Sequence, residues 1–167
     1  MSVEGLHIRR AEPDDYSGIH EIFNSPTVVP GTLQLPYPSR EDWRRRLIET
    51  PESRYNLVAV IGDRIVGMIC LDTFPNKPRR RHAGVIGICV HDEWQGKGVG
   101  MALMRAIVDL ADNWLNLKRL ELEVFADNEL AIRLYERFGF EVEGTLRQHA
   151  FRDGQYVDSK VMRRLRP

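Results

Sequence analysis

A glycine-rich hexapeptide, Gln-Gly-Lys-Gly-Val-Gly at residues 95–100, constrains the fold of this chain more than any other stretch. Residues 84–90 before it are apolar and β-branched, as in a buried strand, and apolar residues recur at helical spacing in residues 101–111 after it. The hexapeptide is therefore predicted to join a strand to a helix. The first N–H groups of such a helix have no acceptor within it, and the positive end of its dipole lies there. We expect this loop to bind an anion, because glycine lets a phosphate approach the backbone closely.

The spacing of the glycines separates this loop from two familiar nucleotide-binding loops. The dinucleotide fingerprint places its third glycine one residue later than Gly100, and the NTPase loop requires Ser or Thr where Gly98 follows Lys97. The pattern of Gln95, Gly98 and Gly100 instead resembles the acetyl-CoA pyrophosphate loop of the GCN5-related N-acetyltransferase (GNAT) family. Residues 128–140 resemble the second cofactor segment of the same family.

Composition favours a single globular domain over residues 1–167, with 43% hydrophobic residues and a formal net charge of zero. This charge predicts no attraction to nucleic acid or to a membrane surface. The chain has no apolar stretch near the roughly 20 residues of a membrane helix and no signal-peptide segment, so we expect a cytoplasmic protein. The two cysteines, Cys70 and Cys89, and the five histidines lack metal-ligand spacing. We expect reduced core thiols, no metal site and no ligand or base role for any histidine.

The order of predicted elements extends the resemblance to the whole chain. We expect strands at residues 6–10, 55–61, 65–72, 84–90, 119–125, 145–151 and 156–162. We expect helices at residues 13–23, from Ser39 as a cap through residue 48, from the glycine loop to residue 115 or 117, and at 128–138. This α/β order resembles the GNAT acyl-CoA N-acyltransferase fold, a mixed central sheet with helices on both faces. The resemblance implies that the strands before and after the long helix splay apart and open a slot for the pantetheine arm.

The resemblance also implies acetyl-CoA as co-substrate and assigns residues to bind it. These are Ile88, Cys89 and Val90 on the strand, Gln95, Gly96, Lys97, Gly98, Val99, Gly100 and Met101 in the loop, and Asn128 and Tyr135 on the next helix. The backbone of the loop is expected to bind the phosphates, and an N–H near Val90 to polarise the acetyl carbonyl. Lys97 is either a phosphate ligand or a solvated lysine, and Asn128 binds the arm, caps its helix, or does both.

Two residues are candidates for catalysis. Tyr135 occupies the position where family members carry a tyrosine beside the cofactor sulphur, and would donate to the departing thiolate. Many relatives place a carboxylate where this chain has Val85, so that base is absent. Glu123 matches the base proposed for the ribosomal-protein-acetylating branch and would act through a water. The alternatives are an ordinary core tyrosine and a solvent-facing pair, Glu121 and Glu123.

The acceptor is predicted only through further resemblance. Residues 32–39, 112–114 and 152–158 look most like those of bacterial L-amino-acid N-acetyltransferases, which implies a small-molecule amine such as an apolar L-amino acid. The expected acceptor wall, which could equally pack onto the domain, consists of Leu33, Gln34, Leu35 and Tyr37. The basic run at residues 77–81 either binds the 3′-phosphate or an acidic partner, or is a solvated loop.

Two other functions and an oligomeric state remain open at this point. Glu123 and Tyr135 would also suit an enzyme that acetylates protein N-termini, and a glycine loop would also be retained by a non-catalytic acyl-CoA-binding module. A homodimer is possible because the last strands often pair across subunits in this family.

Overall fold

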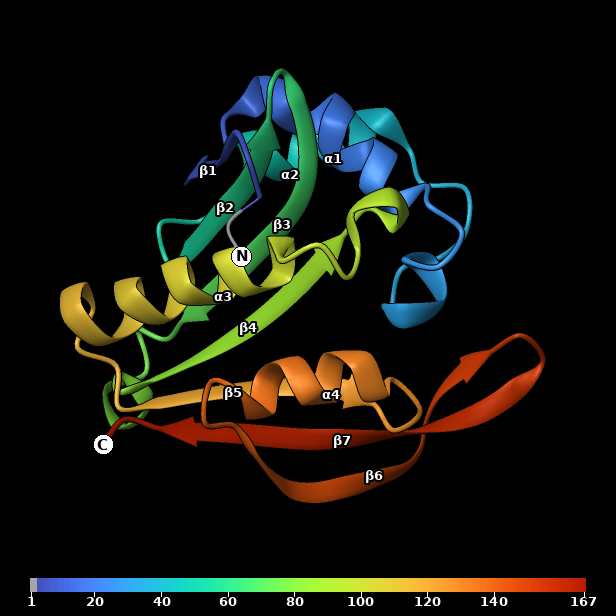
Figure 1. Cartoon of the computed structure of the whole chain (residues 1–167). Coiled ribbons are helices and arrows are strands. Elements are labelled where there is room, and N and C mark those ends of the chain that lie inside the picture. Colours follow the sequence, from blue (N-terminus) through green and yellow to red (C-terminus); the bar gives the residue numbers. More distant parts are fainter. Residues whose placement is uncertain (1–2) are drawn as a thin grey trace.

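The computed structural model describes residues 3–167 as one seven-stranded mixed sheet with helices on both faces (Figure 1). The strand order is β1-β2-β3-β4-β5-β7-β6. The strands are β1 (Leu6–Arg10), β2 (Arg54–Ile61), β3 (Arg64–Thr73), β4 (Ala83–Val90), β5 (Arg119–Phe125), β6 (Glu141–Arg152) and β7 (Gln155–Leu165). The α-helices are α1 (Tyr16–Phe23), α2 (Arg40–Ile48), α3 (Val99–Asp109) and α4 (Glu129–Glu136). The predicted fold class is confirmed.

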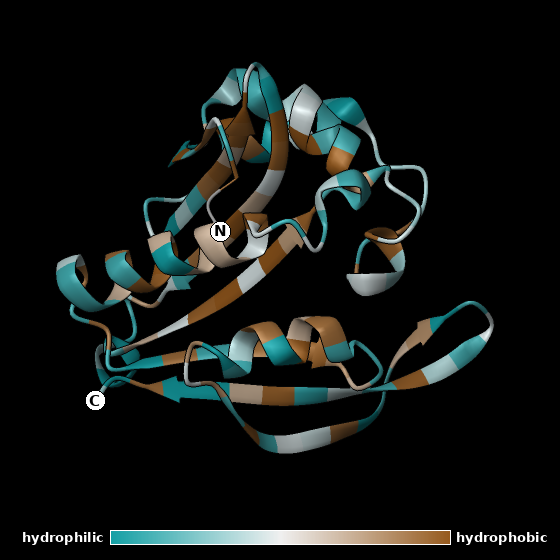
Figure 2. Cartoon of the chain, viewed as in Figure 1, coloured by the Kyte–Doolittle hydropathy of each residue, from teal (hydrophilic) through white to brown (hydrophobic). Residues whose placement is uncertain are grey.

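Side chains alternate between two apolar layers on the sheet. Ile69 and Leu71 of β3 pack with α3 and α4, whereas Met68 on the same strand packs with α1 and α2. Both faces of the central strands are therefore buried, which explains their nearly continuous apolar sequences. Figure 2 shows this pattern, with β3 and β4 mostly hydrophobic and the far end of α3 hydrophilic.

The helix ends follow local sequence signals. Ser39 caps α2, since its Oγ accepts a hydrogen bond of 3.2 Å from the N–H of Asp42, as predicted. Gly139 after α4 has a φ of +81°, as expected of a left-handed C-terminal residue. The long helix departs from expectation, because α3 ends at Asp109 and a π-helical turn, Leu110–Trp114, replaces its last part.

The sheet opens between its two parallel strands, β4 and β5. They are paired only where residues 83–85 lie beside residues 119–121. Beyond this point the two strands separate, as Figure 1 shows, and within residues 3–167 β4 keeps only its partner β3 through residue 90. The predicted splay is therefore present, and the side of β4 that faces β5 is open over residues 86–90.

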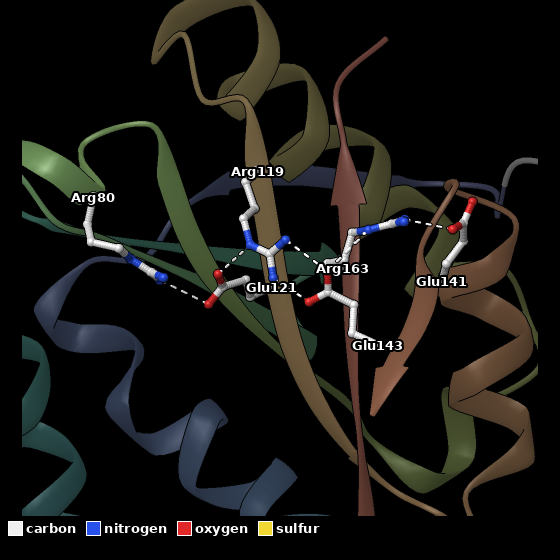
Figure 3. A network of polar contacts seen from close by, with 6 residues as sticks. All are labelled: Arg80, Arg119, Glu121, Glu141, Glu143 and Arg163. Atoms are coloured by element: carbon white, nitrogen blue, oxygen red, sulfur yellow. Dashed lines mark hydrogen bonds and ion pairs between the residues drawn. The ribbon is translucent and has the colours of Figure 1, made fainter. Parts of the chain in front are cut away.

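A chain of charged side chains crosses the closed end of this splay (Figure 3). Glu121 on β5 accepts hydrogen bonds from Arg119 at 2.6 Å and from Arg80 at 3.0 Å, and Arg80 belongs to the loop that precedes β4. Arg119 also pairs with Glu143 on β6, and Arg163 on β7 pairs with both Glu143 and Glu141. The network links the loop before β4 to three successive strands on the other side of the opening.

Glu121→Gln is expected to lower the free energy of unfolding by roughly 1–2 kcal/mol at pH 7, because the half-buried carboxylate bridges two arginines. Partial burial raises the pKa of Glu121, but the hydrogen bonds from Arg119 and Arg80 outweigh it and leave the pKa below its usual 4.5. A lowered folded-state pKa adds stability that is complete above the unfolded pKa and is lost as the pH falls through the folded one. Urea unfolding should therefore show a wild-type advantage that is constant above about pH 5.5 and shrinks in more acidic solution.

Glu129→Gln provides the matched control for this change. Glu129 pairs with Arg133 one turn along α4, and its side chain is 78% exposed. An exposed pair of this kind contributes little, so its loss should change stability by less than about 0.5 kcal/mol. Equal effects of the two substitutions would contradict the structural role of the network.

Candidate active site

A cavity of about 1150 Å³ lies where β4 and β5 separate. The end of β4, the glycine loop and α4 line one part of it, and the loop between α1 and α2 together with α2 lines another. The cavity therefore reaches both faces of the sheet through the opening. This arrangement allows two molecules to meet across the splayed strands.

The glycine loop has the backbone conformation that its sequence predicts. Gly96 and Gly98 have φ angles of +71° and +91°, in the region that favours glycine. Gly98 is the N-terminal capping residue of α3, and no side chain among residues 3–167 caps this helix, so its first-turn N–H groups remain available to an anion. The Gln95 side chain donates 3.1 Å hydrogen bonds to the Val90 carbonyl and the Thr27 hydroxyl, which ties the loop to β4 and to the α1–α2 loop.

Most of the residues expected to bind acetyl-CoA line this one cavity. They are Ile88, Cys89, Val90, Gln95, Gly96, Lys97, Gly98, Gly100, Met101, Asn128 and Tyr135. Val99 differs, because its side chain is fully buried in the core. The Val90 carbonyl accepts a hydrogen bond from the Gln95 side chain. Lys97 is exposed, with its Nζ 5.1 Å from the centre of the Trp94 ring.

The helix α4 presents two of these residues to the cavity. Asn128 caps it, since its Oδ1 accepts a 3.2 Å hydrogen bond from the N–H of Ala131, and this confirms the capping alternative. Tyr135 is only 6% exposed and its ring lies 6.0 Å from that of Phe140. Burial raises the pKa of the Tyr135 hydroxyl, because the phenolate would lose its hydration. Tyr135 therefore stays protonated and can act as a hydrogen-bond donor.

Glu123 lines the same cavity from β5, with half of its side chain exposed. Its neighbour Glu121 is held in the ion network, so the two glutamates are not an equivalent solvent-facing pair. His149 on β6 places its Nε2 3.5 Å from Glu123 Oε2. His149 could not be identified from the sequence, because a contact between strands so distant in the chain leaves no local spacing signal.

The α1–α2 side of the cavity is apolar at its base and carries an arginine. The rings of Phe23 and Trp43 stack with centres 4.3 Å apart, and Met68 lines the cavity beside them. Arg46 lies over Trp43, 4.8 Å from the ring centre, and donates to the Gln34 side chain at 3.0 Å. Within residues 3–167 it has no carboxylate partner. Arg46 is thus a cation able to bind a carboxylate on this side of the cavity, and no local sequence pattern indicates its position.

The predicted acceptor wall is only partly present. Gln34 lines the cavity, but Leu33, Leu35 and Tyr37 do not, and they are 67%, 81% and 97% exposed. These three side chains neither form the pocket nor pack onto the domain. The loop itself is held by hydrogen bonds along its length, because Thr27 donates to Asp92, Arg152 donates to the carbonyl of Pro30, and Gln34 accepts from Arg46.

The remaining sequence expectations concern the basic run, the two cysteines, metal binding and membrane helices. The basic run at residues 77–81 does not line the cavity, and Arg80 is held in the ion network. Cys70 and Cys89 are free thiols that line the cavity, and burial raises the pKa of both.

In the part of the chain that the structure describes, no cluster of three His, Cys, Asp or Glu side chains could hold a metal ion. In residues 3–167, no helix is long and apolar enough to cross a membrane.

Known acetyltransferases resemble this chain along most of its length. The model of the acetyltransferase (GNAT) family matches residues 16–140. The chain is 44% identical to the L-amino acid N-acetyltransferase AaaT of Escherichia coli (strain K12), over 95% of this chain and 97% of the relative. It is 29% identical to the spermidine N(1)-acetyltransferase of the same strain, over 93% of this chain and 83% of that protein.

Solved structures match along nearly the whole chain. The spermidine N-acetyltransferase from Vibrio cholerae in complex with CoA and spermine superposes with a TM-score of 0.84 at 27% identity, covering 98% of this chain and 96% of that one. A GCN5-related N-acetyltransferase from Kribbella flavida gives 0.81 at 27% identity, covering 98% and 99%.

Proposed function

Because the chain belongs to the acetyltransferase (GNAT) family and is an N-acetyltransferase, we propose that it transfers the acetyl group of acetyl-CoA to the amine of an apolar L-amino acid. One observation carries the choice of acceptor. The cavity joins the glycine loop to an apolar pocket beside Phe23 and Trp43, where Arg46 has no carboxylate partner among residues 3–167. An apolar side chain and a carboxylate on one small molecule match these two features.

The cofactor part of the site fits acetyl-CoA on structural grounds. Anionic phosphates suit the first turn of α3 and the positive-φ glycines Gly96 and Gly98, and an extended arm suits the unpaired side of β4. When bound, acetyl-CoA supplies the activated acetyl thioester. The residues that would hold it are those of the glycine loop, residues 88–90, Asn128 and Tyr135.

The chain's own residues supply three functions in the reaction. Glu123, through a water, takes a proton from the acceptor's ammonium so that the nitrogen lone pair becomes free. A backbone N–H near Val90 stabilises the developing charge on the carbonyl oxygen. Tyr135 Oη donates a hydrogen bond to the departing sulphur. Its raised pKa favours donation over complete proton transfer.

Arginine at the acceptor end favours an anionic acceptor over a polycation. Spermidine carries only positive charge, which Arg46 would repel, whereas an amino acid offers it a carboxylate. Arg54, which also lines the cavity, is already paired with Asp72 through hydrogen bonds of 2.6 and 2.8 Å. Arg46 is therefore the guanidinium on this side of the cavity that we assign to the acceptor carboxylate.

The decisive experiment measures release of CoA thiol from acetyl-CoA with free amino acids, amino-acid amides, polyamines and N-terminal peptides. Turnover with apolar amino acids and little with their amides supports the proposal. Preference for peptides would instead support protein N-terminal acetylation, and preference for spermidine would overturn the acceptor assignment. Tight acetyl-CoA binding without turnover for every amine would overturn the proposed reaction.

Arg46→Gln is expected to raise the KM for a free amino acid about 10- to 100-fold, the value of one charge-assisted hydrogen bond. The kcat should change by less than about threefold, because the carboxylate does not react. Arg45→Gln is the matched control, since Arg45 pairs with Asp42 on the exposed side of α2 and does not line the cavity. Equal KM values for the two variants would remove Arg46 from acceptor binding.

We further propose a cytoplasmic homodimer. The ends of β6 and β7 project beyond the other strands in Figure 1. There Phe151 and Tyr156 are 65% and 66% exposed, with their rings 5.1 Å apart. An exposed aromatic pair on a projecting hairpin is a suitable surface for a second copy. Sedimentation of the wild-type protein and of Phe151→Ser tests this assembly, and a wild-type monomer would reject it.

A further inference from the structure

A β-bulge in β6 brings His149 to the acceptor face of the sheet. Residues 146 and 149 would point to opposite faces in a regular strand, because side chains alternate. Here Leu146 is paired with Ser159 and Ala150 with Val157, so β6 contains two extra residues between these pairs. Gln148 has a φ of +49°, which breaks the alternation and turns His149 back towards Ser159.

The bulge is fixed by Asp158 on β7. Its carboxylate accepts hydrogen bonds from the N–H of Gln148 at 2.8 Å and from the Arg147 side chain at 2.7 Å. These two bonds lower the pKa of Asp158, with the backbone bond as the main cause. Asp158 therefore stays ionised and stabilises the backbone that positions His149.

His149 connects Ser159 to Glu123 across three strands. Its Nδ1 lies 2.9 Å from Ser159 Oγ, and its Nε2 lies 3.5 Å from Glu123 Oε2. Ser159 is only 2% exposed, whereas Glu123 reaches the cavity with half of its side chain exposed. The imidazole therefore lies between a buried hydroxyl, within hydrogen-bond distance of Nδ1, and a carboxylate near Nε2.

The chemistry of these partners determines the tautomer. A carboxylate can only accept, so Nε2 must carry a hydrogen to interact favourably with Glu123. In the neutral ring Nδ1 is then the acceptor, and the Ser159 hydroxyl donates to it. Resting on the proposed function, in which Glu123 is the base, we propose that His149 is a positioning residue that orients the Glu123 carboxylate towards the acceptor ammonium.

In the step that it supports, the N–H bond of the acceptor ammonium breaks and its electron pair remains on nitrogen. The proton passes through a water to a Glu123 oxygen, where an O–H bond forms. His149 neither gains nor loses a proton. It holds one oxygen of Glu123 so that the other faces the cavity.

Two substitutions at the same position separate positioning from packing. Glutamine can place an amide N–H close to the position of Nε2, whereas the shorter asparagine places it near Nδ1. His149→Asn is expected to lower kcat about 10-fold, and His149→Gln to retain at least about half of the wild-type kcat. Neither substitution should change the KM for acetyl-CoA more than about twofold. In the Glu123→Gln background the two substitutions should have equal kcat values, because the carboxylate that they orient is gone.

The tautomer of His149 can be measured without any enzymatic turnover. Imidazole ¹⁵N chemical shifts of the folded protein should report the Nε2–H tautomer of neutral His149, and Ser159→Ala should produce a mixture of tautomers. Equal kcat values for the Gln and Asn variants, or an Nδ1–H tautomer in the wild type, would overturn the proposal. If wild-type protein turned over no amine at all, the proposed function would fail, while the tautomer measurement would still test the geometry.

Discussion

Tyr135→Phe is expected to lower kcat about 100-fold while leaving the KM for acetyl-CoA within about twofold of the wild type. The substitution removes one hydroxyl and keeps the ring, which packs 6.0 Å from Phe140 in the core. A 100-fold loss corresponds to about 2.7 kcal/mol of transition-state stabilisation. That amount is reasonable for one hydrogen bond to a charge that develops in a water-poor site.

The raised pKa of Tyr135 determines which role the hydroxyl can have. An unperturbed tyrosine near pKa 10 already gives up its proton to a thiolate near 8.5 only at a cost of about 2 kcal/mol. Burial raises the pKa of Tyr135 and increases this cost. We therefore expect the hydroxyl to stabilise the leaving sulphur by donating a hydrogen bond, and the thiolate to collect its proton from solvent later.

Steady-state release of CoA thiol, together with calorimetric binding of acetyl-CoA, checks this expectation. Tyr156→Phe is the matched control, because Tyr156 lies on the β6–β7 hairpin with 66% of its surface exposed and does not line the cavity. It should keep wild-type kinetics. Unchanged turnover in Tyr135→Phe, with intact acetyl-CoA binding, would exclude both donation and proton transfer by this residue.

Features encoded locally were predictable from the sequence. Ser39 predicts the start of α2, because a short polar side chain can accept hydrogen bonds from the first N–H groups of a helix. Gly98 indicates the start of α3, because few other residues adopt its φ of +91°. The alternation in residues 119–125 correctly identifies β5. In each case the residue and its structural consequence lie within a few positions of one another.

Features that depend on distant pairing were not predictable from local pattern. The splay of β4 from β5 was implied only by family resemblance, since no local property of either strand shows where their pairing stops. Gln148 adopts a positive φ although it is not glycine, so the bulge that places His149 beside Glu123 gives no local signal. The apolar residues Leu33 and Leu35 lie in a proline-rich loop without periodicity, and their outward direction could not be read from it.

Gly98→Ala is expected to raise the Kd for acetyl-CoA about 10- to 100-fold with a smaller effect on stability. A side chain at a φ of +91° costs roughly 1–2 kcal/mol, so the loop should relax away from its present conformation. That conformation directs the first N–H groups of α3 towards the cavity, and even a small rotation of the loop would misalign several donors together. The loss in binding should therefore exceed the backbone strain alone.

Gly62→Ala separates this specific effect from general strain. Gly62 also has a positive φ, +57°, but it lies in the turn between β2 and β3 and does not line the cavity. Both variants should unfold at slightly lower temperature, whereas only Gly98→Ala should lose acetyl-CoA affinity in calorimetry. If the two variants bound acetyl-CoA equally well, the phosphates would have to be held mainly by side chains such as that of Lys97. The helix terminus would then lose its assigned role, because binding by side chains does not depend on the direction of the loop's N–H groups.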